Sequence, residues 1–152
     1  MEHIAVFIND AEHARRTLEP LLARGATPTR WLMVLCAPRL TRHAGRWTSR
    51  GAKAQWRETW AAQARESLVP LTQRTGGAES FEWLVAQGPL VQLTQKLRLR
   101  VGAGLRVLDA RRLRAGAVNE PLVAGQKPLQ GEQEAAPWLA ASALSLMLAL
   151  AD

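Results

Sequence analysis

The residues best suited to do chemistry form an arginine-rich turn that follows a short apolar strand. The strand is predicted over about residues 105–109, and Arg111, Arg112 and Arg114 come directly after it. In α/β proteins, ligands bind at the carboxyl ends of parallel strands. Planar guanidinium groups donate paired hydrogen bonds to phosphate or carboxylate oxygens. The turn therefore predicts a site for a small anionic ligand, and a solvated basic turn is the alternative interpretation.

Other strand ends supply the remaining candidate ligand-binding residues. Asn9 and Asp10 follow the first predicted strand, where a ligand's sugar or base would lie, although Asp10 is also suited to cap the next helix. Asp109 ends the fourth strand and either orients a ligand hydroxyl or pairs with a neighbouring arginine. Leu35, near the end of the second strand, completes the predicted set.

A basic loop between the second strand and the second helix suggests a different class of partner. In this alternative, the protein associates with nucleic acid through residues 39–50 and 96–114. Arginines would contact phosphates and a tryptophan would stack on a base. The competing interpretation is a charged, solvent-exposed loop. The candidate residues in the loop are Arg39, Arg42, Arg46, Trp47 and Arg50.

The charge of the 152-residue chain is formally +7 and unevenly distributed. Residues 30–65 carry eight basic residues against Glu58 alone, residues 96–114 carry seven against one aspartate, and residues 115–152 are net acidic. Such zones favour an anionic partner. Arginine accounts for 17 of the 20 basic residues, a bias that a GC-rich genome would also produce.

Residue patterns for catalysis are weak, which favours a non-enzymatic protein over a nucleotide-hydrolysing enzyme. The three histidines have no metal-ligand spacing, so no metal is expected. There is no Gly-x-Ser-x-Gly motif. Cys36 is the only cysteine, and its position at the end of an apolar strand is typical of a buried small hydrophobe.

The chain shows no secretory leader, and its longest apolar run, residues 138–151, is too short to span a bilayer. We therefore expect a cytoplasmic protein without a membrane partner.

Apolar runs and helical periodicities alternate along the chain and predict a three-layer α/β/α fold, Rossmann-like, with a mainly parallel four- or five-stranded sheet. In residues 96–101 a strict alternation also allows a hairpin, but a helix completes the strand–helix repeat. Pro20 and Pro70 predict bends in their helices. The expected strands cover about residues 3–8, 31–36, 81–86 and 105–109, and the expected helices cover 11–24, 52–75 and 90–101.

The chain is predicted to form a single domain, residues 1–152, whose last part has a different character. Residues 115–136 are rich in loop-forming residues, and residues 137–151 predict a helix that is apolar nearly all round. Such a helix in a small protein suggests a homodimer interface that includes Trp138, Leu146 and Leu150.

The pattern of residues 4–18, 32–38, 85–88 and 101–108 resembles the universal stress protein family. These segments are similar to that family's opening strand, acidic turn and first helix, its second strand, and its third through fourth strands. The resemblance covers about residues 3–110, in pattern more than in identities. It implies an adenine-nucleotide-alpha-hydrolase-like fold and a homodimeric, stress-response type of regulatory domain.

The chain departs from this family where ATP would bind. The usual aspartate at the end of the first strand is replaced by Asn9. The glycine signature of ATP-binding members falls on Asp109, Arg112, Leu122 and Val123, and none of the four matches. We therefore do not expect ATP to bind in the family's usual manner, and the cofactor stays unknown.

Overall fold

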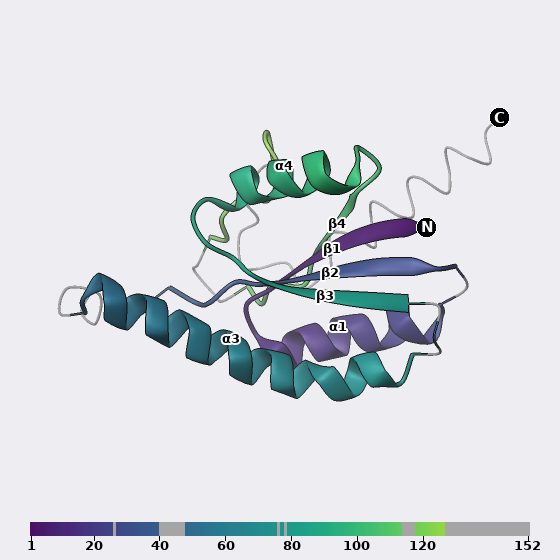
Figure 1. The fold of residues 1–152 in the computed structure, drawn as a ribbon, viewed down its shortest axis with the longest axis horizontal. Helices are drawn as coiled ribbons and strands as arrows, with labels where there is room; N and C mark the ends of the chain where they lie inside the picture. Colours follow the sequence, from purple (N-terminus) through teal and green to yellow (C-terminus); the bar gives the residue numbers. More distant parts are fainter. Residues whose placement is uncertain (26, 40–47, 76, 78, 114–117, 127–152) are drawn as a thin grey trace.

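The computed structural model describes residues 1–25, 27–39, 48–75, 77, 79–113 and 118–126. Strands and helices alternate along the chain, as the sequence predicts (Figure 1). Their bounds are β1 (Glu2–Ile8), α1 (Ala11–Ala23), β2 (Thr29–Leu35), α3 (Arg50–Gln73), β3 (Glu79–Val85), α4 (Leu90–Val101) and β4 (Arg106–Asp109). The predicted C-terminal helix and its interface residues Trp138, Leu146 and Leu150 lie outside the described residues.

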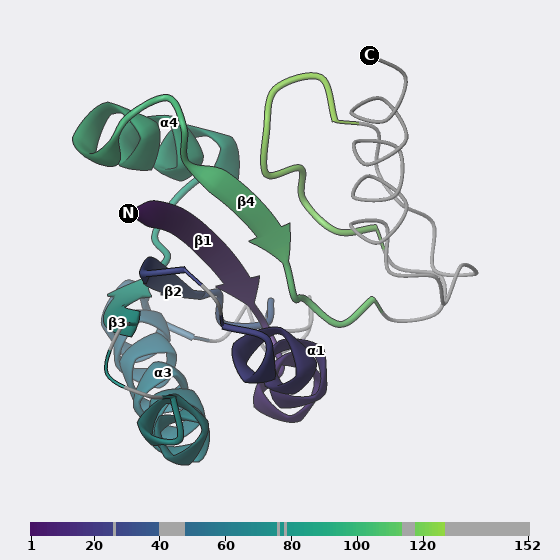
Figure 2. The same ribbon diagram turned by 90° about the vertical axis from the view of Figure 1, so that its right-hand side faces the viewer.

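The described strands form one parallel sheet with helices on both faces, which confirms the predicted three-layer α/β fold. Helices α1 and α3 lie side by side on one face, and α4 covers the other (Figure 2). Each face has its own buried core, because the strand side chains alternate between the two. Val6 and Met33 pack toward α1 and α3, whereas Phe7 and Leu32 pack toward α4.

The strand order β3-β2-β1-β4 places a topological switch point between β1 and β4. From β1 the chain builds outward through β2 to β3, and then crosses to the other side of β1 to form β4. Helices on the two sides of such a point leave the sheet in opposite directions, so a crevice opens at the carboxyl ends of the strands. The residues that follow β1 and β4 therefore border the crevice.

Residues 90–101 form a helix, so the hairpin alternative is wrong for this segment. Leu90, Thr94 and Leu97 are buried at helical spacing, and this burial outweighs the local alternation of apolar and basic residues. The helix ends at Gly102, whose φ of 114° is a conformation that glycine adopts without strain.

Helix α3 differs from expectation at its start. Its buried stripe is Ala61, Ala64, Leu68 and Leu71. Helical spacing relative to Ala64, Leu68 and Leu71 predicts that Trp56 is part of that stripe, but Trp56 is exposed. The first turns of α3 extend past the sheet, which explains the exposure of Trp56 (Figure 1). The helix is also continuous through Pro70, as α1 is through Pro20.

Strand β4 lies at an edge of the described sheet, which accounts for an arginine within it. Arg106 is exposed and forms an ion pair with Glu2 of the neighbouring β1. No helix among the described residues is long and apolar enough to cross a membrane.

Candidate functional site

A cleft of about 620 Å³ lies at the carboxyl end of the sheet. Its walls come from the segments that follow all four strands, from the first residue of α4, from α3 and from residues 118–120. This size is typical of small-ligand sites. The lining residues are Asn9, Cys36, Ala37, Pro38, Arg39, Arg57, Ala86, Gly88, Pro89, Leu90, Arg111, Arg112, Val118, Asn119 and Glu120.

Asn9 joins the two sides of the switch point. Its side-chain amide donates to the carbonyl oxygen of Arg112 (3.1 Å), and its side-chain oxygen accepts from the backbone N–H of the same residue (2.6 Å). An amide side chain carries both a donor and an acceptor, so it pairs with a peptide group as a second peptide would. Asn9 thereby fixes the turn after β4 against the end of β1.

Asp10 caps helix α1, which confirms the structural interpretation of this residue. Its carboxylate accepts from the backbone N–H of His13 (3.0 Å), and it also lies 3.5 Å from the Arg112 guanidinium. The hydrogen bond from His13 is the main reason that the pKa of Asp10 is lowered, and Arg112 lowers this pKa further. Asp10 is not among the cleft-lining residues and acts on the site by holding Arg112.

Asp109 and Arg111 form a local ion pair, one of the two roles predicted for Asp109. The carboxylate accepts from Arg111 Nε (2.9 Å), from Nη2 (3.0 Å) and from the backbone N–H (3.1 Å). The Arg111 side chain is only 4% exposed, which excludes a fully solvated basic turn at this residue. Two of the five guanidinium N–H groups point to Asp109, and the planar group is held rigidly at the cleft wall.

Glu120 places a carboxylate at the N-terminus of α4. One of its oxygens accepts from the backbone N–H of Leu90 (2.9 Å), and the other lies 3.8 Å from the Arg39 guanidinium. The N-cap residue of α4, Pro89, makes no side-chain capping hydrogen bond, so a distant residue supplies the cap. The positive end of a helix dipole favours a negative group at this place. The cleft thus already holds one anionic group from its own chain.

Cys36 lines the cleft but is not suited to act as a nucleophile. Burial raises the pKa of its thiol to about 12, although Arg111 opposes this effect. The thiolate is the reactive form of cysteine. At neutral pH the side chain is therefore a protonated, small hydrophobe, as the sequence indicates.

We expect Cys36 of the native protein to react with iodoacetamide at least about a hundredfold more slowly than in urea at pH 8. A rise in pKa from 9.0 to about 12 lowers the thiolate fraction about a thousandfold. Mass spectrometry of timed samples gives both rates. Similar rates in the two conditions would show that the thiol is accessible and ionised, contrary to its buried position. Because the pKa of Cys36 is raised in the folded protein, the contribution of this thiol to the free energy of unfolding is complete below pH 9. The contribution is lost as the pH rises from 9 toward 12.

The cleft brings together Asn9, Arg111 and Arg112 from the predicted ligand set. Leu35 lies elsewhere, almost fully buried in the core on the α3 side of the sheet. Arg39, predicted for nucleic acid, also lines the cleft, and Arg50 is the first residue of α3. The other predicted site residues, Arg42, Arg46, Trp47 and Arg114, lie outside the described residues.

The sequence prediction missed Arg57 and Glu120. Arg57 belongs to the basic segment of residues 30–65, but nothing in the local sequence indicates that α3 places it near the strand ends. Glu120 follows β4 by eleven positions, so only the folded chain brings it to α4. Gly88 and Pro89 also line the cleft. The sequence could have indicated this, because the pair follows a strand and so lies at the carboxyl edge of the sheet.

No group of three His, Cys, Asp or Glu side chains suited to a metal ion occurs among the described residues. Comparison with family models, with curated proteins and with solved structures finds no match to this chain.

Proposed function

We propose that this protein is a non-enzymatic regulatory domain that binds a small anionic ligand in the cleft at the carboxyl ends of its strands. The observation that carries the proposal is the position of Arg39, Arg57, Arg111 and Arg112 around one cleft at the switch point of a parallel sheet. These arginines come from three separate segments, namely the residues after β2, helix α3 and the turn after β4, so the cationic character belongs to the fold and not to one basic run.

A phosphate-sized or carboxylate group fits the chemistry of this cleft. Arg111 is rigid and buried, and it offers N–H groups beyond the two that Asp109 accepts. Arg39 and Arg112 are exposed and can adjust to ligands of different size. A buried, oriented guanidinium beside exposed cations suits a ligand with one anionic group and a larger, variable remainder.

The wider proposal includes a homodimer, a cytoplasmic location and a distant relationship to the universal stress protein family. The order of strands and helices supports the relationship, since it follows the order that the resemblance implies. The arginine turn in place of a glycine signature supports a ligand other than ATP, or a different manner of binding it.

A thermal-shift screen of the full chain tests this function. The ligands are inorganic phosphate, AMP, ADP, ATP, cyclic AMP and heparin, each at low and high salt. A saturable rise in Tm with one small anion that persists at high salt supports the proposal. A rise with heparin alone that disappears at high salt contradicts it and favours a nucleic-acid partner.

A further inference from the structure

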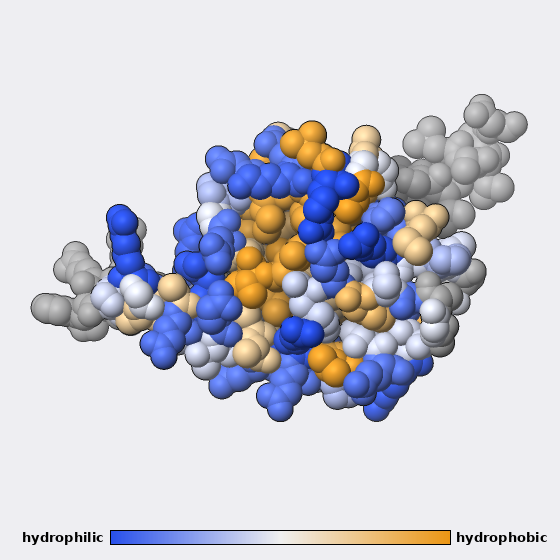
Figure 3. All heavy atoms as spheres, viewed as in Figure 1, coloured by the Kyte–Doolittle hydropathy of each residue, from blue (hydrophilic) through white to orange (hydrophobic). Residues whose placement is uncertain are grey.

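Strand β3 presents apolar side chains at the open edge of the sheet. Within the described part of the chain it pairs only with β2, and every residue from Phe81 to Val85 is half-buried. Phe81, Trp83 and Val85 lie on the face of α1 and α3, and Leu84 lies on the face of α4. Figure 3 shows the resulting apolar hollow between the two helix layers, at the carboxyl half of the strand. Exposed apolar edge strands can pair with a strand of another chain, so this edge is a candidate contact surface.

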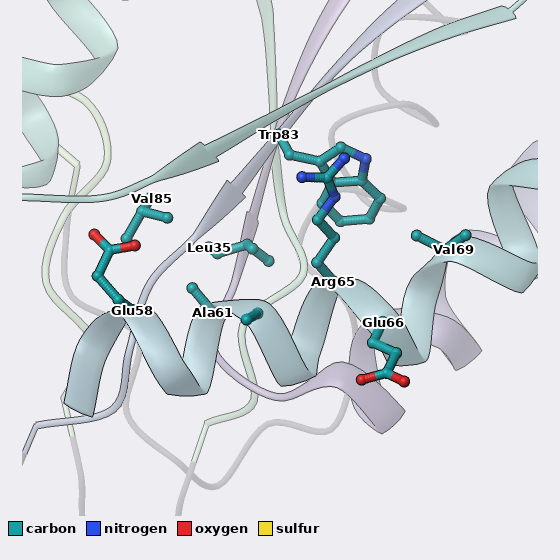
Figure 4. A pocket seen from close by; sticks show the side chains of 9 residues that line it. Leu35, Glu58, Ala61, Arg65, Glu66, Val69, Trp83 and Val85 are labelled. Atoms are coloured by element: carbon teal, nitrogen blue, oxygen red, sulfur yellow. The ribbon is translucent and has the colours of Figure 1, made fainter. Parts of the chain in front are cut away.

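A groove of about 390 Å³ runs between this edge and α3. Leu35, Ala61, Val69, Trp83 and Val85 give it an apolar floor. Charges of both signs lie along it: Glu58 is beside Val85, and Arg65 covers the Trp83 ring, with its guanidinium carbon 5.7 Å from the ring centroid (Figure 4). The two charges therefore lie at different levels along the strand.

The backbone of β3 can accept a further strand. The N–H of Ala86 donates to the carbonyl oxygen of Leu35, so this group points toward β2. Peptide groups alternate in direction along a strand. The N–H and C=O groups of Phe81, Trp83 and Val85 consequently point to the open side, where a new strand would pair with them.

We propose that β3 pairs antiparallel with β3 of a second copy, about a two-fold axis at Leu84, to form one continuous sheet. In this register, Leu84 meets its own symmetry mate, and Trp83 lies opposite Val85 of the second copy. Apolar side chains then meet on both faces of the sheet. The contact is isologous, as expected for a closed dimer.

The positions of the charged side chains favour the register centred on Leu84 over those centred on Trp83 or Glu82. Strands and α3 run in opposite directions, so a register centred on Leu84 brings Arg65 of each copy to the level of Glu58 in the other. A two-fold axis at Trp83 would instead place the two Arg65 side chains at the same level. An axis at Glu82 would set two carboxylates directly opposite each other, which is unfavourable.

The carboxylate of Glu82 does not block the proposed pairing. Burial opposes its ionisation, but hydrogen bonds from Arg100 and Arg30 (2.8 Å each) outweigh this effect and lower the pKa of Glu82. The charge is thus balanced within its own chain. In the proposed register this residue lies opposite Ala86 of the second copy.

Cysteine cross-linking of the full chain tests the register. With Cys36→Ala as background, Leu84→Cys is expected to form a disulfide-linked dimer under mild oxidation. Opposed Cα atoms of a non-hydrogen-bonded antiparallel pair are about 4.5 Å apart, within the range that disulfides span. Leu99→Cys is the matched control, because Leu99 is 88% exposed and is not one of the buried residues of α4. Equal cross-linking of the two variants would overturn the proposal.

A charge exchange on α3 tests the contact between the copies. Arg65→Glu and Glu58→Arg each place like charges together and are expected to weaken the dimer at least about tenfold, measured by sedimentation. The double variant restores opposite charges and should restore the dimer. A monomeric wild-type protein, or a double variant as weak as the single ones, would contradict the proposal.

This inference rests on the homodimer within the proposed function and is independent of the anion-binding cleft. Phosphate titrations of the same variants distinguish a failure of the proposed interface from a failure of anion binding, because neither Leu84 nor Arg65 lines that cleft. A monomeric wild-type protein that still binds phosphate would overturn the interface alone.

Discussion

Replacing Arg111 with methionine is expected to abolish saturable anion binding and to lower the free energy of unfolding by about 3 kcal/mol. The reason is that Arg111 is the buried partner of Asp109, whose carboxylate keeps 21% of its side-chain surface exposed. Removing the guanidinium leaves that carboxylate without its ion-pair partner and takes the fixed cation from the cleft. Urea unfolding gives the stability, and isothermal titration with inorganic phosphate gives the binding.

Two further variants separate the effect on binding from the effect on stability. Arg112→Met removes an exposed guanidinium from the same cleft and should cost less than about 1 kcal/mol. The double variant Asp109→Asn/Arg111→Met leaves no unpaired charge, so it should regain much of the stability but none of the binding. Phosphate binding by Arg111→Met at wild-type strength would place the ligand outside this cleft.

Replacing Glu120 with glutamine is expected to strengthen anion binding about tenfold. The amide oxygen of glutamine can still accept from the N–H of Leu90, so the helix cap is kept while the charge is lost. Arg39 is then released from its ion pair, and the α4 N-terminus no longer carries a competing carboxylate. The affinity ratio from phosphate titrations at constant ionic strength measures this effect.

Glu19→Gln provides a control with the same change of net charge. Glu19 lies on the exposed side of α1, where it pairs weakly with Arg15 and Arg74. A purely long-range effect of charge would strengthen binding equally in both variants. Equal affinities for Glu120→Gln and the wild-type protein would mean that Glu120 does not compete with the ligand.

Much of the fold could be predicted from the sequence because burial leaves a local pattern. Ala5 to Ile8 and Trp31 to Leu35 are buried in the centre of the sheet, and an unbroken apolar run reveals such strands. The hairpin alternative at residues 96–101 arose because a local alternation resembles a strand until the distant sheet face is known. The prediction that Trp56 is buried was wrong for a similar reason, because helical spacing does not show where the sheet beneath the helix ends.

The candidate site could be predicted only where a strand end supplied it. Asn9 directly follows β1 and Arg111 lies two residues after the end of β4, so the topology rule for parallel sheets identifies them. Glu120 and Arg57 come from segments whose position depends on the whole fold. The sequence also could not show that Arg111 is buried, since a run of arginines is ordinarily solvated and only tertiary packing covers this one.

The most direct test of the anion-binding cleft is a ¹⁵N–¹H correlation spectrum of the full chain during titration with inorganic phosphate. The proposal predicts saturable shifts concentrated at the backbone amides of Leu90 and Arg112, which bond to Glu120 and Asn9 in the free protein. Small shifts spread over exposed arginines such as Arg100 and Arg106, rising in proportion to salt, would contradict it.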